Sequence, residues 1–261
     1  MKFTTHPILK GPTPEEIKKL CFNEDGSSKQ EGLKTLVEMH RMHEDAVANA
    51  DVDPLNFGVS LKGWEYADEM LNNYDTLMIF GGNRSSKTEY GARSVVKAAL
   101  KNPKSIIVCF AQDADASIRT QQAAVYRYLP PEFKVKTKGV LEYLNYTVKN
   151  GFTGQSFILP NGSQVLFHTY SQFIANRSKF EGLELGSKTP EWHNIGLWPD
   201  EYLEDGDLIR TMRFRLATRD AKMLLTFTPI DGYTPFVAEF LKGAETRKTR
   251  KAPLLDGEEV P

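Results

Sequence analysis

The first 75 residues carry a helical pattern of apolar positions. Thr13-Pro14-Glu15-Glu16 predicts a helix start, because threonine can cap, proline suits the first helical position and Glu16 can return a bond to the cap. Apolar spacing predicts a second helix over about residues 28–50 and a third over 64–71, which Asn72-Asn73 can end. Residues 51–56 are expected to form a linker. The front of the chain is therefore predicted to be helical.

Beyond residue 75, short continuous apolar runs alternate with helical spacing. Such runs are typical of buried strands in a parallel sheet. The predicted segments are, in chain order, a strand over 76–80, a helix over 87–100, a strand over 105–110, a helix from Asp113 or Asp115 to Leu129, a hairpin of 156–159 and 163–169 around Pro160-Asn161-Gly162, and strands over 195–198 and 223–227. Two strands with an intervening helix imply a right-handed parallel crossover. The pattern predicts an α/β sheet domain with an inserted hairpin.

Composition narrows the class of protein. The chain has 261 residues, of which 40% are hydrophobic and 26% charged, so it resembles an ordinary globular chain and global disorder is excluded. No apolar run approaches the roughly 20 residues that span a bilayer, and the start has no apolar signal segment, so a soluble, unexported protein is expected. Cys21 and Cys109 support neither a disulfide framework nor a zinc site and fit a reducing compartment.

Charge is distributed unevenly along the chain. Residues 1–75 contain 8 Lys+Arg and 14 Asp+Glu, a net charge of −6; the remainder contains 25 and 20, a net of +5, and the two give the overall −1. The body is therefore the candidate for contact with a polyanion. A basic cluster near the end, opposed only by Glu245, is either such a contact or a solvated tail; it consists of Lys242, Arg247, Lys248, Arg250 and Lys251.

The segment between the first predicted strand and its helix matches a phosphate-binding loop. It fits G-x-x-x-x-G-K-[ST] at every fixed position except the second glycine, which is Ser86. Backbone N–H groups would surround phosphates, the Lys87 ammonium would bridge β and γ oxygens, and the Thr88 hydroxyl would bind Mg²⁺. The alternative is an ordinary glycine-rich turn, but the flanking strand and amphipathic helix favour a nucleotide site. Its predicted residues are Gly81, Gly82, Asn83, Arg84, Ser85, Ser86, Lys87 and Thr88.

Two acids follow a later apolar run. A nucleoside triphosphatase needs a carboxylate on a neighbouring strand for the metal and a base for the attacking water. Asp200 would bind Mg²⁺ through water, and Glu201 would orient the attacking water or accept its proton. Pro199 either disturbs a central strand or ends it and aims the acids. Hydroxyls in Thr226-Phe227-Thr228-Pro229 are either a γ-phosphate sensor or part of a β-branched strand before a turn.

The order and spacing of these motifs, rather than any one of them, resemble a known family. The segments that carry the resemblance, over roughly residues 60–240, are the Gly81–Thr88 loop, the 113–130 helix, Lys179-Phe180-Glu181-Gly182, residues 198–201, residues 213–220 and Thr226-Phe227-Thr228-Pro229. Together they look like the ATPase domain of the terminase large subunit of tailed bacteriophages, the DNA-packaging motor. The resemblance implies a P-loop ATPase of the additional-strand, catalytic-glutamate type that works as a ring on a viral portal.

The resemblance implies a role for single residues. Arg84 matches a basic residue that the family places inside its loop, where a guanidinium can stabilise charge on the γ-phosphate of the same subunit. Ser86 departs from the family glycine, which could tighten the loop or slow turnover. The remaining matches are Lys87 for the phosphate, Thr88 and Asp200 for the metal, Glu201 as the catalytic glutamate and Thr228 in the coupling motif.

Ring motors commonly complete a site with an arginine from the neighbouring subunit. Arg177 is the preferred candidate because it precedes the 179–182 motif, although any such residue can equally be a surface arginine. The family's glutamine-centred adenine motif is not evident near Trp64, so Trp64 and Tyr66 are expected in the core. The other candidate arginines are Arg119, Arg213 and Arg215.

These observations predict an ATPase, dependent on ATP and Mg²⁺, that drives double-stranded viral DNA into a procapsid. The resemblance implies as partners the portal protein, the small terminase subunit and other copies in a docked ring, with a monomer in solution and no membrane. It places the protein in the cytoplasm of the infected bacterial host and, transiently, at the portal vertex. Two alternatives stay open, namely a helicase-like translocase and a non-hydrolysing nucleotide-binding assembly module.

The expected organisation is a helical region over 1–75, an ATPase domain over 76–241 and a basic, then acidic, tail over 242–261. The family normally carries a metal-dependent nuclease domain after the ATPase. Only about one helix and a polar tail follow Phe240, so no DNA cleavage by this chain is expected. The chain thus looks like the motor half of a longer protein or a separately encoded version.

Overall fold

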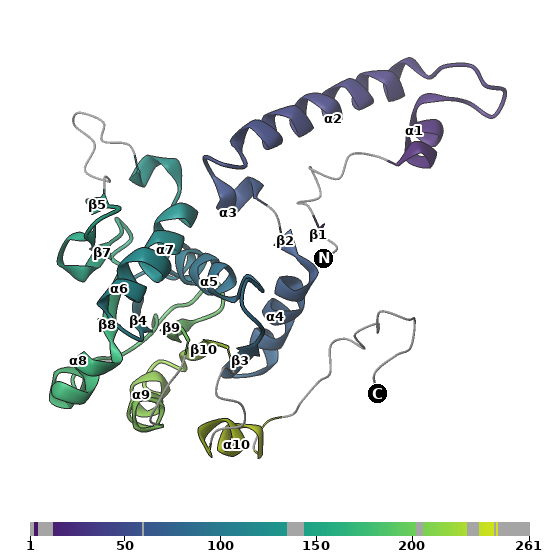
Figure 1. Cartoon of the computed structure of the whole chain (residues 1–261). Helices are drawn as coiled ribbons and strands as arrows, with labels where there is room; N and C mark the ends of the chain where they lie inside the picture. The colour runs from purple at the N-terminus through teal and green to yellow at the C-terminus, as the bar shows by residue number, and fades with distance from the viewer. Residues whose placement is uncertain are drawn as a thin grey trace.

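A six-stranded sheet lies at the centre of the molecule (Figure 1). The computed structural model describes residues 3–4, 13–58, 60–134, 144–201, 206–228, 235–242 and 244. In their order across the sheet, the strands are β3 (Thr76–Phe80), β10 (Lys222–Phe227), β9 (Ile195–Pro199), β4 (Ile106–Ala111), β8 (Gln164–Thr169) and β7 (Ser156–Ile158). The first five are parallel, and β7 pairs antiparallel with β8. The predicted α/β class, mostly parallel sheet and hairpin are confirmed.

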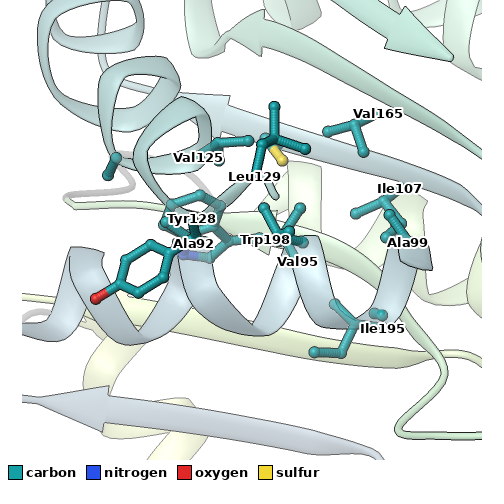
Figure 2. Packing of buried hydrophobic residues seen from close by; sticks show 14 of the residues in the cluster. Ala92, Val95, Ala99, Ile107, Val125, Tyr128, Leu129, Val165, Ile195 and Trp198 are labelled. Carbon is teal, nitrogen blue, oxygen red and sulfur yellow. The ribbon is translucent and has the colours of Figure 1, made fainter. Parts of the chain in front are cut away.

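Helices cover both faces of this sheet. Alternate residues of β4 enter different cores: Ile107 and Cys109 belong to one buried cluster, and Val108 and Phe110 to the other. The first cluster includes residues of α4, α5 and α7, and the second includes residues of α8 and α9. Figure 2 shows residues of α5 and α7 around Trp198. The helices around the sheet are α4 (Lys62–Asn73), α5 (Lys87–Lys101), α6 (Ala114–Ala116), α7 (Ala123–Tyr128), α8 (Tyr170–Ala175), α9 (Asp207–Ala217) and α10 (Pro235–Lys242).

The helix predicted to run from Asp113 to Leu129 contains a π-helical segment, η2 (Ser117–Gln122), between α6 and α7. Asp113 caps the start by accepting from the Ala116 N–H at 2.8 Å. Within η2, Gln122 Nε2 donates to the hydroxyl of Ser117, five residues earlier, at 3.0 Å. Both side chains are buried. This fifth-residue contact fits the wider π turn, which apolar spacing alone does not reveal.

The front of the chain is helical, as expected, with one correction. Residues 51–56 were expected to be a linker, but α3 (Pro54–Phe57) forms there because Asp53 accepts from the Asn56 N–H and Pro54 begins the turn. Helix α1 (Pro14–Cys21) has the predicted capping box, with Thr13 and Glu16 bonding each other's backbone. In Figure 1, the long helix α2 (Gln30–Asn49) extends away from the sheet.

Two short antiparallel strand pairs lie outside the central sheet: β1 (Phe3–Thr4) with β2 (Ser60–Leu61), and β5 (Tyr146–Thr147) with β6 (Gly151–Phe152). Three short 3₁₀ helices are η3 (Pro131–Phe133), η4 (Thr153–Gln155) and η5 (Arg177–Phe180). Among the described residues, no helix combines the length and apolar character needed to cross a bilayer. Except for Lys242, the basic cluster near the end lies outside the described residues.

Candidate nucleotide-binding site

The loop over residues 81–86 joins β3 to α5. Ser86, immediately before α5, has φ +63° and ψ 25°, and Arg84 has φ +60°. This left-handed conformation costs an L-residue roughly 1–2 kcal/mol, so position 86 favours glycine. Gly81 is required for space, since a Cβ there would lie 2.4 Å from Ser85 Oγ. The loop therefore keeps a glycine-like backbone at the position where this sequence has serine.

Lys87, the first residue of α5, folds its side chain back over the loop. Its ammonium donates to the Gly82 carbonyl at 3.0 Å and to Ser85 Oγ at 3.3 Å, and the residue is only 6% exposed. Both of these acceptors are neutral, so the loop does not neutralise the ammonium. The start of a helix adds partial positive charge to the same place. The loop is therefore suited to an anion.

Asp200 joins the loop to the centre of the sheet. The Thr88 hydroxyl donates to its two carboxylate oxygens at 3.2 and 3.1 Å, and the Thr226 hydroxyl donates to Oδ1 at 2.5 Å. The pKa of Asp200 is raised from 3.8 to about 6, chiefly because burial disfavours the carboxylate; the Glu201 carboxylate contributes to the rise, and the hydrogen bond from Thr226 opposes it. A buried carboxylate thus faces the first turn of α5.

Pro199 ends β9 and does not disturb the sheet. The ladder continues directly beyond it, because the Asp200 N–H donates to the Phe110 carbonyl of β4 and the Glu201 N–H to the Thr226 carbonyl of β10, both at 2.8 Å. Of the two predicted effects of Pro199, disturbing a central strand or ending it, the structure shows the second. The acids follow at the carboxyl edge of the sheet, where ligands bind in parallel α/β folds.

Glu201 is held by a hydroxyl and by a left-handed backbone. Thr228 Oγ1 donates to Glu201 Oε1 at 3.0 Å, and Glu201 has φ +61°. The Tyr170 hydroxyl, at the start of α8, donates to the Asp200 carbonyl at 2.9 Å and to the Glu201 carbonyl at 3.3 Å. Tyr170 therefore supports the backbone of both acids from a third segment of the chain.

Comparison with protein families adds an independent observation. The model of the family described as "Terminase large subunit, T4likevirus-type, N-terminal" matches residues 78–255 of the chain. The chain belongs to this terminase family. No curated protein matches it. The match starts within β3 and includes the loop, both acids and Thr228, and it reaches further towards the end of the chain than the resemblance noted from the motifs.

The arginines predicted for this terminase site lie in different places. Arg84 is exposed within the loop itself. Arg177 belongs to η5; its guanidinium pairs with Asp207 at 2.9 Å and lies 5.7 Å from the centre of the Phe173 ring. Its side chain is 48% exposed, so it remains accessible to another molecule. Its assignment to a neighbouring subunit's site stays a prediction.

The other candidate arginines lie on the surface or half-buried in helical segments. Arg119 pairs with Asp115 at 2.7 Å on the surface, Arg213 is exposed on α9, and Arg215 is half-buried on the same helix. Trp64 lies in the core, 8% exposed, as expected of a packing residue. Tyr66 on α4 is half-buried.

Sequence reasoning missed two contacts around the acids. Tyr170 carries no motif, and its hydroxyl reaches the Asp200 and Glu201 carbonyls only in the folded chain. The hydrogen bond from the Trp198 indole to Thr226 likewise requires that β9 and β10 be neighbours in the sheet. The signal available in the sequence was the spacing of Thr226, near the end of β10, and Thr228, just after it, since both hydroxyls can be placed at the same edge as Asp200 and Glu201.

Proposed function

We propose that this chain binds ATP with Mg²⁺ at the carboxyl edge of β3, β9 and β10, hydrolyses it, and uses the turnover to move double-stranded DNA into a procapsid. One observation carries the proposal: the hydroxyl of Thr88, in the first turn of α5, meets the Asp200 carboxylate across 112 residues of sequence. Membership of the terminase large subunit family supports it, because the N-terminal domains of these subunits are generally ATPases.

The residues fit a magnesium ion that arrives with nucleotide. The Thr88 hydroxyl and the Asp200 carboxylate are hard oxygen ligands whose atoms already lie 3.1 Å apart. They would hold the ion together with phosphate oxygens and water, and the ion would neutralise charge on the transferred phosphoryl group. The described part of the chain has no cluster of three His, Cys, Asp or Glu side chains, but a site shared with phosphates does not need one.

The chain's own groups would supply the remaining steps. Lys87 would exchange its neutral loop oxygens for β- and γ-phosphate oxygens, and backbone N–H groups at the start of α5 would bind the same phosphates. Glu201 would leave Thr228 and accept a proton from the attacking water. Arg84 would stabilise the negative charge that develops on the phosphoryl oxygens. The carboxyl edge of the sheet would thus provide the groups that hydrolysis requires.

The direct test is steady-state phosphate release by the Glu201→Gln variant. Turnover should fall by a factor of about 10² to 10⁴, because the amide cannot accept the proton, while ATP binding persists. Glu65→Gln, at an exposed carboxylate on α4, is the matched control and should keep the rate of the parent chain. Full hydrolysis by Glu201→Gln would remove Glu201 from the mechanism.

The same assay separates the kinds of motor. We propose double-stranded DNA, a portal and the small terminase subunit as partners, with ring assembly of several copies at the portal in the host cytoplasm and monomers in solution. Stimulation of phosphate release by double strands supports packaging, whereas stimulation by single strands alone indicates a helicase-like translocase. ATP binding without any phosphate release indicates an assembly module.

A further inference from the structure

A buried line of hydrogen bonds ends on Asp200. The indole Nε1 of Trp198 donates to Thr226 Oγ1 at 2.8 Å, and Thr226 Oγ1 donates to Asp200 Oδ1 at 2.5 Å. Trp198 and Thr226 have no exposed surface, and Asp200 is 4% exposed. Water therefore does not compete for these bonds, and each polar atom depends on the next.

The chemistry of the groups fixes the direction of this line. An indole N–H can only donate, and a threonine hydroxyl has a single proton. Since Thr226 Oγ1 accepts from Trp198, its own proton is directed to Asp200 Oδ1. Thr226 therefore acts as a fixed donor and not as a rotating hydroxyl. One carboxylate oxygen is thereby restrained, and the other, Oδ2, lies 3.1 Å from the Thr88 hydroxyl.

Helix α5 fixes the position of the indole. Gly91 in this helix lies against Trp198 so closely that a Cβ would be 2.2 Å from the indole Cε2 atom. Figure 2 shows Trp198 packed beside Ala92 and Val95 of the same helix. Thr88 is in the first turn of α5. The same helix therefore carries the Thr88 hydroxyl and packs against the indole that donates to Thr226.

We propose that Thr226 and Trp198 are positioning residues, which hold the Asp200 carboxylate in the orientation that binds the metal of a metal–nucleotide complex. The inference rests on the proposed function, since it needs nucleotide and metal at this site. It differs from the alternative that Thr226 is simply a β-branched residue of a central strand. In that case its methyl group would matter and its hydroxyl would not.

The test measures metal affinity directly, by electron paramagnetic resonance during titration of Mn²⁺ into the chain saturated with ADP. Thr226→Val keeps the shape and removes the hydroxyl, and should weaken Mn²⁺ binding about tenfold, as loss of a residue that orients a ligand does. Thr226→Ser keeps the donor and should bind Mn²⁺ within about twofold of the parent chain. ADP binding in EDTA should be unchanged in both, and Thr76→Val on β3 is the matched control.

Each result distinguishes a positioning role of the Thr226 hydroxyl from a role as a β-branched strand residue. Parent-like Mn²⁺ affinity in Thr226→Val, or equal losses in the Ser and Val variants, would overturn the positioning role. If Thr226→Val does not fold, Trp198→Phe is the deciding variant, because it keeps an aromatic ring and frees the Thr226 hydroxyl to rotate. A loss of Mn²⁺ affinity smaller than tenfold in this variant supports the inference. Unchanged Mn²⁺ affinity overturns it. Absence of Mn²⁺ binding by the ADP-saturated parent chain would instead refute the proposed function, and the inference with it.

Discussion

Asp200→Asn should stabilise the chain in the absence of metal and nucleotide. Asp200 is 4% exposed, and its pKa rises from 3.8 to about 6 because burial disfavours the carboxylate. Each unit of pKa corresponds to about 1.4 kcal/mol, so keeping this group ionised at neutral pH costs roughly 3 kcal/mol of folding free energy. The asparagine is uncharged, its oxygen can accept from Thr226, and its NH₂ can donate to the Thr88 hydroxyl.

The sign of the pH dependence follows from linkage. The folded pKa of Asp200 lies above the unfolded one, so between pH 3.8 and about 6 the folded state binds more protons than the unfolded state. The contribution of Asp200 to stability therefore falls as pH rises through this window, and the full cost is present above it. The advantage of Asp200→Asn should accordingly be large at pH 8 and almost absent at pH 4.

The measurement is the melting temperature in EDTA at several pH values. At pH 8 a gain of about 3 kcal/mol corresponds to roughly 6–12 °C for a domain of this size. Asp113→Asn is the control, because asparagine caps a helix as well as aspartate does and this side chain is exposed. A melting temperature for Asp200→Asn at or below that of the parent chain at pH 8 would refute the argument that burial of the charge is a net cost.

Two further predictions concern the loop. Ser86→Gly should raise the free energy of unfolding by up to about 1 kcal/mol, because glycine adopts φ +63° without the cost that serine bears; a melting temperature that is unchanged or lower would contradict this strain. Arg84→Ala should lower kcat for ATP hydrolysis by about a hundredfold with little change in ATP binding, whereas Arg41→Ala on α2 should have no effect. An unchanged rate would show that the loop arginine takes no part in catalysis.

The local pattern of apolar and polar residues was sufficient to predict the strands of the central sheet and the loop between β3 and α5. The apolar run before Gly81 and the amphipathic spacing after Lys87 each act within a few residues, so strand, turn and helix could be read without knowledge of the rest of the chain. The same holds for the strand that ends at Pro199. Features that depend on buried polar contacts, such as the π turn stabilised by Gln122 and Ser117, were not predictable in this way.

The position of each side chain within the site depends on strand order. Trp198 and Thr226 are neighbours only because β9 lies next to β10, and Tyr170 reaches Asp200 only because β8 places α8 at the same edge. Hydrophobic runs predict that strands exist, but they do not say which strands are adjacent. The acids were therefore recognised in the sequence, whereas the residues that orient them appeared only in the folded chain.

The main polar groups of the site are already occupied by partners from the same chain. Lys87 bonds neutral oxygens of its own loop, Thr88 bonds Asp200, and Thr228 bonds Glu201. Under the proposed function, a nucleotide would have to exchange these contacts for its own, so its binding would be linked to a rearrangement of these side chains. The Thr228 bond is the most consequential, because it engages one carboxylate oxygen of Glu201, the residue proposed to accept a proton from water. Under the proposed function, we expect this contact between the end of β10 and the Glu201 turn to change during hydrolysis, and such a change at the sheet edge would couple chemistry to movement.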